Sequence, residues 1–210
     1  MKTDNDIICQ VKNLTFSYSD FPLFDQSNFD FHAGINLVLG GDGKGKSSLL
    51  KLLAGVLHAH TGQLLIHGTS LQEQPDAYRK QVFWIDPASD MFDHMTALEF
   101  FASLSASYPG FDADQIPQLA EGMGLTLHLH KQLFMLSTGS KRKVWLAAAF
   151  AANAPVSLLD DPFAALDKNS IQFIQSLLKQ AADDPSRTWI LAMYTEPTGV
   201  PLKNTINLGD

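Results

Sequence analysis

The sequence predicts an α/β fold built on a parallel sheet, and three observations lead to this prediction. A glycine-rich loop at residues 40–47 follows an apolar, strand-like segment and precedes a leucine-rich helix. The middle of the chain, residues 96–152, has helical patterning. The end returns to strand, helix and strand at residues 156–159, 168–182 and 189–193. Because alternating strands and helices are typical of parallel sheets, we expect one parallel α/β core.

The first third of the chain is rich in strand signals. Short β-leaning segments recur between turn residues at positions 7–11, 14–18, 29–32, 35–39 and 63–66. One helix interrupts them at about residues 46–54, where Leu49, Leu50, Leu52 and Leu53 form an apolar face.

Capping residues set the expected limits of the helical middle section. Thr96 and Ser137 are candidate N-caps, and Pro109-Gly110 is expected to interrupt the helical pattern between them. The final strand, helix and strand follow directly, without a Pro/Gly-rich linker or an internal repeat. With 210 residues and 45% hydrophobic residues, the chain is expected to be a single domain over residues 1–210.

Charge and cysteine content exclude several classes of function. The net charge of −7, from 15 Lys plus Arg and 22 Asp plus Glu, disfavours direct nucleic-acid binding. Cys9 is the one cysteine, so it forms no internal disulfide and is expected in a buried strand. Residues 1–6 lack the features of a secretory signal, and the longest apolar run, residues 144–152, is far short of the roughly 20 residues of a membrane-spanning helix. Any membrane role is therefore expected to come through a partner.

The glycine-rich loop has the spacing of a Walker A phosphate-binding motif. Glycines allow the backbone N–H groups to point inward, and the following helix adds its positive end, so the loop can cradle phosphate. Lys46 is placed to reach the β- and γ-phosphates, and the Ser47 hydroxyl is a candidate Mg²⁺ ligand. The alternative is a flexible glycine turn with an accidental Lys-Ser; Lys44 either adds charge near the phosphates or points into water. We assign nucleotide binding to Gly40, Gly41, Asp42, Gly43, Lys44, Gly45, Lys46, Ser47 and Ser48.

Two carboxylates follow the apolar segment at residues 156–159. Ligands bind at the carboxyl ends of strands in open α/β sheets, so Asp160 and Asp161 are expected at the site. We expect Asp160 to support Mg²⁺, directly or through water, and Asp161 to polarise the attacking water. An acidic turn or a helix cap is the alternative.

These motifs stand in the order found in the ATP-binding cassette (ABC) family, which the chain resembles over nearly its whole length. Residues 136–140, Leu-Ser-Thr-Gly-Ser, resemble the family's LSGGQ signature and are followed by the basic residues 141–143. Residues 164–167 resemble the D-loop, and Tyr18 falls where the family stacks an aromatic ring on adenine. The resemblance implies a P-loop NTPase core with a parallel sheet, an N-terminal antiparallel β subdomain and an inserted helical subdomain at about residues 90–152.

The resemblance also implies the ligands and a second copy of the site. ATP and Mg²⁺ are the implied cofactors, and Ser137 and Gly139 would reach across a head-to-tail dimer to the γ-phosphate held by the other subunit. Taken alone, Ser137 is a helix cap. Tyr18 is either an adenine-stacking residue or a strand residue in the core, with Phe16 as a rival for the stacking role.

Three positions depart from the family pattern. Asp161 stands where the family has Glu, so its carboxylate reaches one methylene less far. Tyr194 or Thr195 stands where the family has a histidine that contacts the γ-phosphate, so this contact is either made by a hydroxyl or missing. Asp86 stands where the family has a metal-binding glutamine; it is either a Mg²⁺ ligand or a residue of a strained loop. These departures suggest slow hydrolysis, a degenerate partner in an asymmetric heterodimer, or an ATP-gated structural role, and the sequence does not choose among them.

We therefore expect an ATPase subunit on the cytoplasmic face of a membrane, which couples ATP binding and hydrolysis to a transmembrane permease as a homodimer or heterodimer. Residues 160–167 most resemble compact exporter ATPases, including haem-export subunits of cytochrome c maturation. The alternative is a binding module that gates a partner with little or no turnover; another soluble P-loop NTPase would leave the signature unexplained. Phe100-Phe101 with Leu98 and Leu104 form an apolar helix face that either receives the membrane partner or lies in the core.

Overall fold

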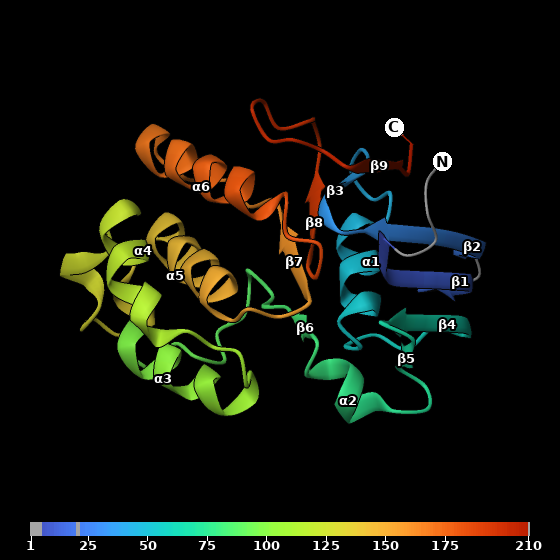
Figure 1. Cartoon of the computed structure of the whole chain (residues 1–210), viewed down its shortest axis with the longest axis horizontal. Coiled ribbons are helices and arrows are strands. Elements are labelled where there is room, and N and C mark those ends of the chain that lie inside the picture. The colour runs from blue at the N-terminus through green and yellow to red at the C-terminus, as the bar shows by residue number, and fades with distance from the viewer. Residues whose placement is uncertain (1–5, 20–21, 210) are drawn as a thin grey trace.

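The computed structural model describes residues 6–19 and 22–209, which form two sheets, with the antiparallel sheet at one end of the molecule and most of the helices at the other (Figure 1). The predicted α/β fold is confirmed, with one parallel and one antiparallel sheet. The expectation for residues 1–6 falls almost entirely outside the described residues. Within the described ranges, no helix is both long and apolar enough to cross a membrane.

The parallel sheet has the strand order β6-β7-β8-β3-β9. Its strands are β6 (Val82–Phe83), β7 (Val156–Asp160), β8 (Thr188–Met193), β3 (Gly34–Leu39) and β9 (Asn204–Asn207). In the register, Leu39 pairs with Met193 and Asp160 pairs with Ala192, so β3, β7 and β8 end at the same edge. Residues that follow these three strands are thereby brought together, although they are far apart in the sequence.

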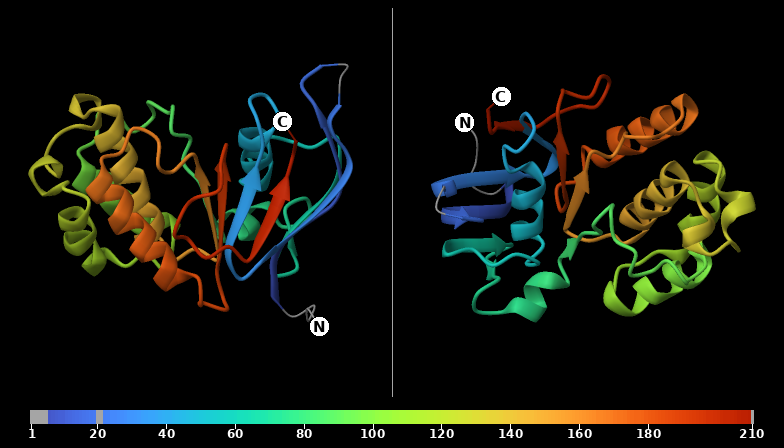
Figure 2. Two further views of the ribbon diagram at one scale, coloured as in Figure 1. Left: turned by 90° about the horizontal axis from the view of Figure 1, so that it is seen from above. Right: turned by 180° about the vertical axis from the view of Figure 1, so that it is seen from behind.

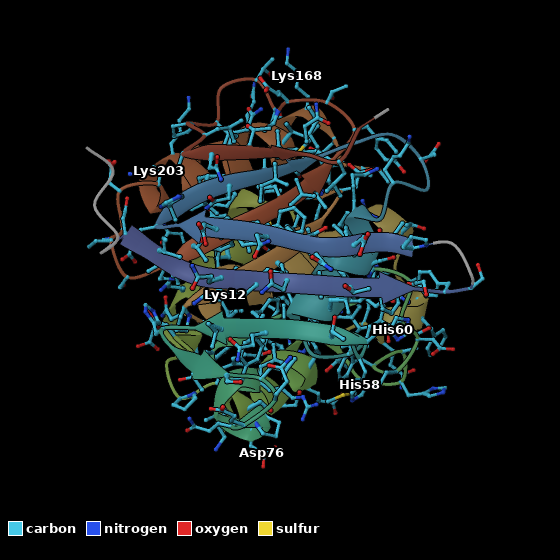
Figure 3. All side chains as sticks on the ribbon, turned by 90° about the vertical axis from the view of Figure 1, so that its right-hand side faces the viewer. Lys12, His58, His60, Asp76, Lys168 and Lys203 are labelled. Atoms are coloured by element: carbon cyan, nitrogen blue, oxygen red, sulfur yellow. The ribbon has the colours of Figure 1, made fainter. Side chains whose placement is uncertain are left out.

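The antiparallel sheet has the order β2-β1-β4-β5 and covers one side of the molecule. Its strands are β1 (Ile7–Ser17), β2 (Pro22–His32), β4 (Thr61–Ile66) and β5 (Thr69–Ser70). The two segments expected at residues 7–11 and 14–18 form the single strand β1, whose register shifts around the positive-φ residue Asn13. Gly62 packs directly against this irregularity: a Cβ there would lie 2.8 Å from the Leu14 backbone. Figure 3 looks onto the outer face of this sheet, with Lys12 on it and His60 at its margin.

Three helices flank the two sheets, and a group of helices fills the other end of the molecule. The flanking helices are α1 (Lys46–Leu53), α2 (Pro75–Arg79) and α6 (Lys168–Ala181). The group consists of α3 (Ala97–Ser107), α4 (Ile116–Gly122) and α5 (Thr138–Ala151), joined by short 3₁₀ turns at Ala113–Gln115, Thr126–His128 and Leu133–Met135. Figure 2 shows this group from above and from behind, set apart from the antiparallel sheet.

Both predicted N-caps of the helical section are confirmed. Thr96 forms a capping box with Glu99, in which each side chain binds the other residue's backbone N–H. The Ser137 hydroxyl accepts a hydrogen bond from Ser140 N–H at the start of α5. The expected interruption is also present, because α3 ends at Ser107, before Pro109.

The core lies on both faces of the parallel sheet, which explains the nearly continuous apolar strands. Ile35 and Leu37 of β3 pack toward the helical group, whereas Val38 packs toward α1 and the antiparallel sheet. Cys9 is buried in the second cluster, as predicted, and burial raises the pKa of its thiol to about 12. Phe100, Phe101 and Leu104 are buried in the first cluster, so the core interpretation is confirmed for them, whereas Leu98 is exposed.

Sequence patterns did not reveal β5, α2 and β9. Each is short, and β9 lies at the edge of the sheet with alternating partial exposure. It is fixed by parallel pairing with β3, for example Leu37 with Thr205, across a large sequence separation. A four-residue segment carries too little hydrophobic periodicity to predict such a strand.

Candidate active site

The glycine-rich loop joins β3 to α1 and presents the start of that helix to an open hollow. Gly45 is the N-cap of α1 at φ 93°, a left-handed conformation that favours glycine. A Cβ on Gly45 would also lie 3.0 Å from the side chains of Leu23 and Phe24. The loop therefore depends on glycine both for its backbone conformation and for its close packing against β2.

Lys46 is held in place by the loop that precedes it. Its ammonium donates hydrogen bonds to the carbonyls of Gly40 at 2.8 Å and Gly41 at 2.7 Å. Only 6% of this residue is exposed, which is unusual for lysine. Lys44, two residues earlier, is exposed, which agrees with the expectation that it points into water.

A hollow of about 320 Å³ opens directly over the loop. Its floor is made by the loop and the first turn of α1, and three further side chains complete it: Tyr18 from the end of β1, Leu23 from β2 and Tyr194 after β8. The hollow thus combines backbone N–H donors, a positive helix end and two aromatic rings. This combination suits a ligand with an anionic part and a flat ring.

Tyr18 stands exposed beside the loop rather than in the core. It is 68% exposed, its ring meets the edge of Phe16 at 4.9 Å, and its hydroxyl lies 3.0 Å from the Ser48 hydroxyl. The core interpretation of Tyr18 was therefore wrong. Phe16 is buried, which removes it as a rival for stacking on a base.

Asp160 and Asp161 lie at the end of β7, facing the first turn of α1. Burial raises the pKa of Asp160, a hydrogen bond with Ser47 opposes that rise, and the neighbouring carboxylates of Asp161 and Asp86 reinforce it. The contact between Ser47 and Asp160 joins two side chains more than 110 residues apart in the sequence. Both residues were predicted as metal ligands, and they do lie together.

The backbone of Asp161 adopts an uncommon conformation. Its φ is 45°, in the left-handed region that non-glycine residues rarely occupy. Three hydrogen bonds hold it: Asp161 N–H donates to the Ala192 carbonyl at 2.9 Å, and the Asp161 carbonyl accepts from Ala164 N–H at 3.1 Å and from the Arg142 guanidinium at 2.5 Å. Such conformations persist only where surrounding contacts enforce them, and they concentrate at functional sites.

Asp86 is engaged by a lysine that the sequence did not single out. Lys51 of α1 forms an ion pair with the Asp86 carboxylate at 2.9 Å, and Ala88 N–H donates to the same side chain at 3.0 Å. Burial opposes the ionisation of Asp86, but these two donors outweigh it and the pKa lies below its usual value. Asp86 therefore has a basic partner in addition to its proximity to Asp160.

Tyr194 covers the loop lysine. The Lys46 ammonium lies 3.8 Å from the centre of the Tyr194 ring, within cation–π distance. A hydrogen bond with Asp42 and the charge of that carboxylate raise the pKa of the Tyr194 hydroxyl. Tyr194, rather than Thr195, is therefore the residue after β8 that reaches the loop.

Ser137 and Gly139 do not line the hollow over the loop of their own chain. Ser137 is exposed at the start of α5, where it caps the helix. Gly139 lies against the segment after β7, and a Cβ there would lie only 2.3 Å from the Ala165 carbonyl oxygen. Glycine at position 139 is thus explained within one chain by this close approach.

The residues present fit a nucleotide and Mg²⁺. The loop N–H groups and Lys46 suit phosphate oxygens, and the paired oxygens of Ser47 and Asp160 are ligands that Mg²⁺ prefers. In the described part of the chain no group of three His, Cys, Asp or Glu side chains could hold a metal ion by itself. Mg²⁺ commonly binds through one or two protein ligands together with substrate phosphates, so a two-residue site is sufficient.

Sequence reasoning missed several residues around this site. Lys51 is one, and the C-terminal Gly209 is another, because its carbonyl accepts a hydrogen bond from Gly41 N–H at 3.0 Å. Arg142 was noted only as one of the basic residues after the signature. No local pattern marks these contacts, since each joins segments that only the folded chain brings together.

Comparison with known proteins gives a consistent result. The family model described as "ABC transporter" matches residues 24–164. A relative in Pseudomonas putida, named "Cytochrome c biogenesis ATP-binding export protein CcmA", is 33% identical over 191 residues, covering 89% of this chain and 90% of that protein. A protein of the same name in Vibrio cholerae is 26% identical, covering 96% and 98%.

Solved structures share the fold. The chain superposes on an ATP-binding subunit of an ABC transporter with a TM-score of 0.79 and 24% identity, covering 89% of this chain and 79% of that one. It also superposes on a bacterial Atm1-family ABC exporter with ATP bound, with a TM-score of 0.74 and 23% identity, covering 92% of this chain and 35% of that one.

Proposed function

The chain belongs to the ABC transporter family, and we propose that it is an ATPase subunit that drives an exporter through a membrane partner. The observation that carries this proposal is the meeting of the Walker A loop and the acidic end of β7: α1 packs against β7, which places Ser47 at the start of α1 near Asp160 and Asp161. The relatives are named as ATP-binding export proteins of cytochrome c biogenesis, which supports a haem-related or similar cargo.

Binding of ATP would use the hollow over the Walker A loop. Tyr18 offers an exposed ring for adenine, and the loop N–H groups with Lys46 would hold the phosphates. The Lys46 ammonium is already desolvated and oriented by two carbonyls, so little of its freedom is lost when phosphate binds.

Hydrolysis would depend on the carboxylates after β7. Ser47 and Asp160 would hold Mg²⁺, which when bound neutralises charge on the β- and γ-phosphates. Asp161 would orient and polarise the water that attacks the γ-phosphate in line. Its left-handed backbone fixes the direction in which this carboxylate leaves the chain.

We expect hydrolysis to be slow for reasons of geometry. Aspartate at position 161 has one methylene fewer than glutamate, so its reach toward the water is shorter by about one C–C bond. Tyr194 supplies a hydroxyl in place of an imidazole, and Asp86 is paired with Lys51. Misplacing a single polar contact in phosphoryl transfer lowers the rate by about two to three orders of magnitude, whereas ATP binding is less sensitive.

We propose that the working unit is a head-to-tail dimer. Ser137 and Gly139 lie outside the hollow of their own chain, and Ser137 is exposed at the positive end of the 14-residue helix α5. A second subunit could place this helix start opposite the γ-phosphate. Either a homodimer or a heterodimer satisfies this arrangement.

An exposed apolar patch offers a surface for the membrane partner. Met91, Phe134 and Met135 are 78%, 55% and 60% exposed. Their segments lie side by side, because Phe134 N–H donates to the Asp93 carbonyl at 3.1 Å and Leu133 N–H donates to the Met95 carbonyl at 2.9 Å. We refer to Met91, Phe134 and Met135 as the apolar patch, and we place the contact with a transmembrane permease there, on the cytoplasmic side of the membrane.

The test is phosphate release by the purified protein with Mg-ATP, together with equilibrium ATP binding. Lys46→Ala is expected to lose both activities, and Asp161→Asn is expected to bind ATP but to hydrolyse it only at a low residual rate. Asp161→Glu is expected to raise kcat by about tenfold, because its carboxylate reaches further toward the water. Failure of the wild-type protein to bind ATP would refute the proposal. Tight binding without turnover would instead leave a gating module, which no observation favours at present.

A further inference from the structure

Three consecutive basic residues near the start of α5, its fourth to sixth residues, each contact a different segment of the chain. Lys141 pairs with Asp93 at 2.5 Å, the Arg142 guanidinium donates to the Asp161 carbonyl at 2.5 Å, and Lys143 pairs with Asp167 at 2.5 Å. Consecutive helical side chains point in directions about 100° apart, so one turn can reach three neighbours. We call Lys141, Arg142 and Lys143 the basic turn.

Two of these contacts, made by Lys141 and Lys143, hold the basic turn against neighbouring segments. Lys143 and Asp167 join the start of α5 to the start of α6, where Asp167 also caps α6 by accepting from Ser170 N–H at 2.9 Å. The lysine and this cap hold the pKa of Asp167 well below its usual value. Lys141 and Asp93 are both largely buried, so this pair is less screened by water than an exposed one.

The third contact, from Arg142, is made to Asp161, whose backbone has the uncommon left-handed conformation. Asp161 is one of two positive-φ residues in residues 160–167, the other being Ala165. The Arg142 hydrogen bond ends on the carbonyl of Asp161 itself, the peptide group whose orientation depends on that residue's ψ. A charged donor at this carbonyl is stronger than a neutral one and favours this peptide orientation.

Packing near Arg142 is incomplete, and the one other donor to the Asp161 carbonyl within the described residues is Ala164 N–H at 3.1 Å, a neutral backbone group. A small cavity of about 30 Å³ lies between α5 and the parallel sheet, bordered by Arg142, Trp145, Asp160 and Pro162. Arg142 Nε and Trp145 Nε1 are buried without hydrogen-bond partners. The guanidinium is therefore a polar link between the helical group and the acidic strand end, beside this small cavity.

We propose that Arg142 is a positioning residue for ATP hydrolysis, which holds the Asp161 backbone in its left-handed conformation and thereby directs the Asp161 carboxylate. Lys141 and Lys143 fix the turn that carries Arg142. This inference rests on the proposed function, because it assigns to Asp161 the role of orienting the water. Helix α5, together with strand β7, therefore sets the position of the Asp161 carboxylate.

The arrangement also gives the apolar patch a physical link to the active site. Asp93, the partner of Lys141, lies in the segment that accepts a hydrogen bond from Phe134 of the patch. A partner that shifts this segment would move the basic turn, and Arg142 would carry the movement to Asp161. The link is a short chain of direct contacts, and each of its members can be changed separately.

The experiment compares Arg142→Met, Arg142→Lys and the control Lys12→Met in the full-length protein. Lys12 is an exposed lysine on the outer face of the antiparallel sheet, so its replacement removes a positive charge away from the helical group (Figure 3). For each variant, kcat, KM for Mg-ATP, the ATP dissociation constant and the thermal unfolding midpoint are measured. Arg142→Met is expected to lower kcat about 10- to 100-fold, with ATP affinity within twofold of wild type. Arg142→Lys, which retains a charged donor, is expected to restore part of kcat, and Lys12→Met is expected to match wild type.

A double-mutant cycle distinguishes positioning from a general loss of structure. If Arg142 acts through Asp161, then Arg142→Met adds no further loss to the residual single-turnover rate of Asp161→Asn. Additive losses, or a fall in ATP affinity that parallels the fall in kcat, would overturn the inference.

Unchanged kcat in Arg142→Met would overturn the inference alone, whereas a wild-type protein without turnover would overturn the proposed function together with it. If Arg142→Met is too unstable to assay, an intermediate kcat in stable Arg142→Lys supports the role and a wild-type kcat opposes it.

Discussion

At the residue scale, the active site is defined by contacts that pair charged groups with unexpected neighbours. Lys46 lies beneath the ring of Tyr194, and Asp86 lies beside Lys51. In each pair one residue belongs to a recognisable motif and the other does not. A ligand that binds Lys46 or Asp86 must therefore compete with the contact that this residue already makes.

The ring of Tyr194 is expected to compete with phosphate for Lys46. Tyr194→Ala removes the cation–π contact, worth about 0.5–1 kcal/mol at an exposed site, and should tighten ATP binding about two- to fivefold. Tyr194→Phe keeps the ring and should retain wild-type affinity. Equilibrium binding of ATP to the three proteins checks this. Weaker binding by Tyr194→Ala would mean that the ring supports the bound nucleotide instead.

The pairing of Asp86 with Lys51 should make a small, pH-dependent contribution to stability. Because the pKa of Asp86 is lowered in the folded protein, its stabilising effect is present above the unfolded value of about 3.9 and is lost as the pH falls through the folded value. Asp86→Asn should therefore reduce the free energy of unfolding at pH 7 by less than about 1 kcal/mol, given the partial exposure of both side chains. Urea unfolding at pH 7 and pH 3 measures the effect. An equal difference at both pH values would show that charge is not its cause.

At the element scale, helix α5 contacts several of the segments that border the active site. Its N-cap Ser137 is exposed, its second residue Gly139 touches the segment after β7, and its basic turn contacts three other segments. Most of the rest of the helix is buried against the parallel sheet and the other helices of the group. One element therefore couples the surface expected to face a second subunit to the acidic strand end.

Because Gly139 lies so close to Ala165, adding one methyl group at Gly139 is expected to lower both stability and turnover. In Gly139→Ala the new Cβ would lie 2.3 Å from the Ala165 carbonyl oxygen, so residues 164–167 or the start of α5 must move. Overpacking of this kind costs about 1–3 kcal/mol, and we expect that loss of unfolding free energy together with reduced turnover. Thr138→Ala adds no atom in the same turn and serves as the stability control. Wild-type stability in Gly139→Ala would mean that this contact relaxes freely.

At the scale of the whole molecule, the two ends of the structure have different roles. The antiparallel sheet and α1 build the ATP hollow, and the group α3, α4 and α5 carries both the signature and the apolar patch (Figure 1). The parallel sheet joins the two ends. Movement of one end relative to the other would change the distance between the signature and the acidic strand end of a neighbouring subunit.

The apolar patch is expected to be needed for membrane association but not for ATP binding. Replacing Phe134 and Met135 together with Asp places charge on the patch, and we expect the protein to be lost from membranes of the native host that contain its partner. Val56→Asp changes an exposed apolar residue next to α1 and should remain associated. Membrane sedimentation and ATP binding are measured in parallel. Retention of the double variant on membranes would show that the membrane partner docks on another surface.

Features whose residues are close together along the chain could be predicted from the sequence. Gly40 to Ser47, the caps Thr96 and Ser137, and Asp160-Asp161 after an apolar strand could all be identified, because loop spacing, capping and strand patterning are local properties. Their order along the chain was also enough to indicate the family, which comparison with known proteins then established.

The residues that meet at the site from distant parts of the sequence became apparent from the folded chain. The partners Lys51 with Asp86, Tyr194 with Lys46 and Arg142 with Asp161 follow from how the strands register and how α5 packs. The same holds for β9, which is too short to be recognised without its neighbour. The physical reason is that such contacts depend on the relative placement of whole elements, and no spacing in the sequence encodes that placement.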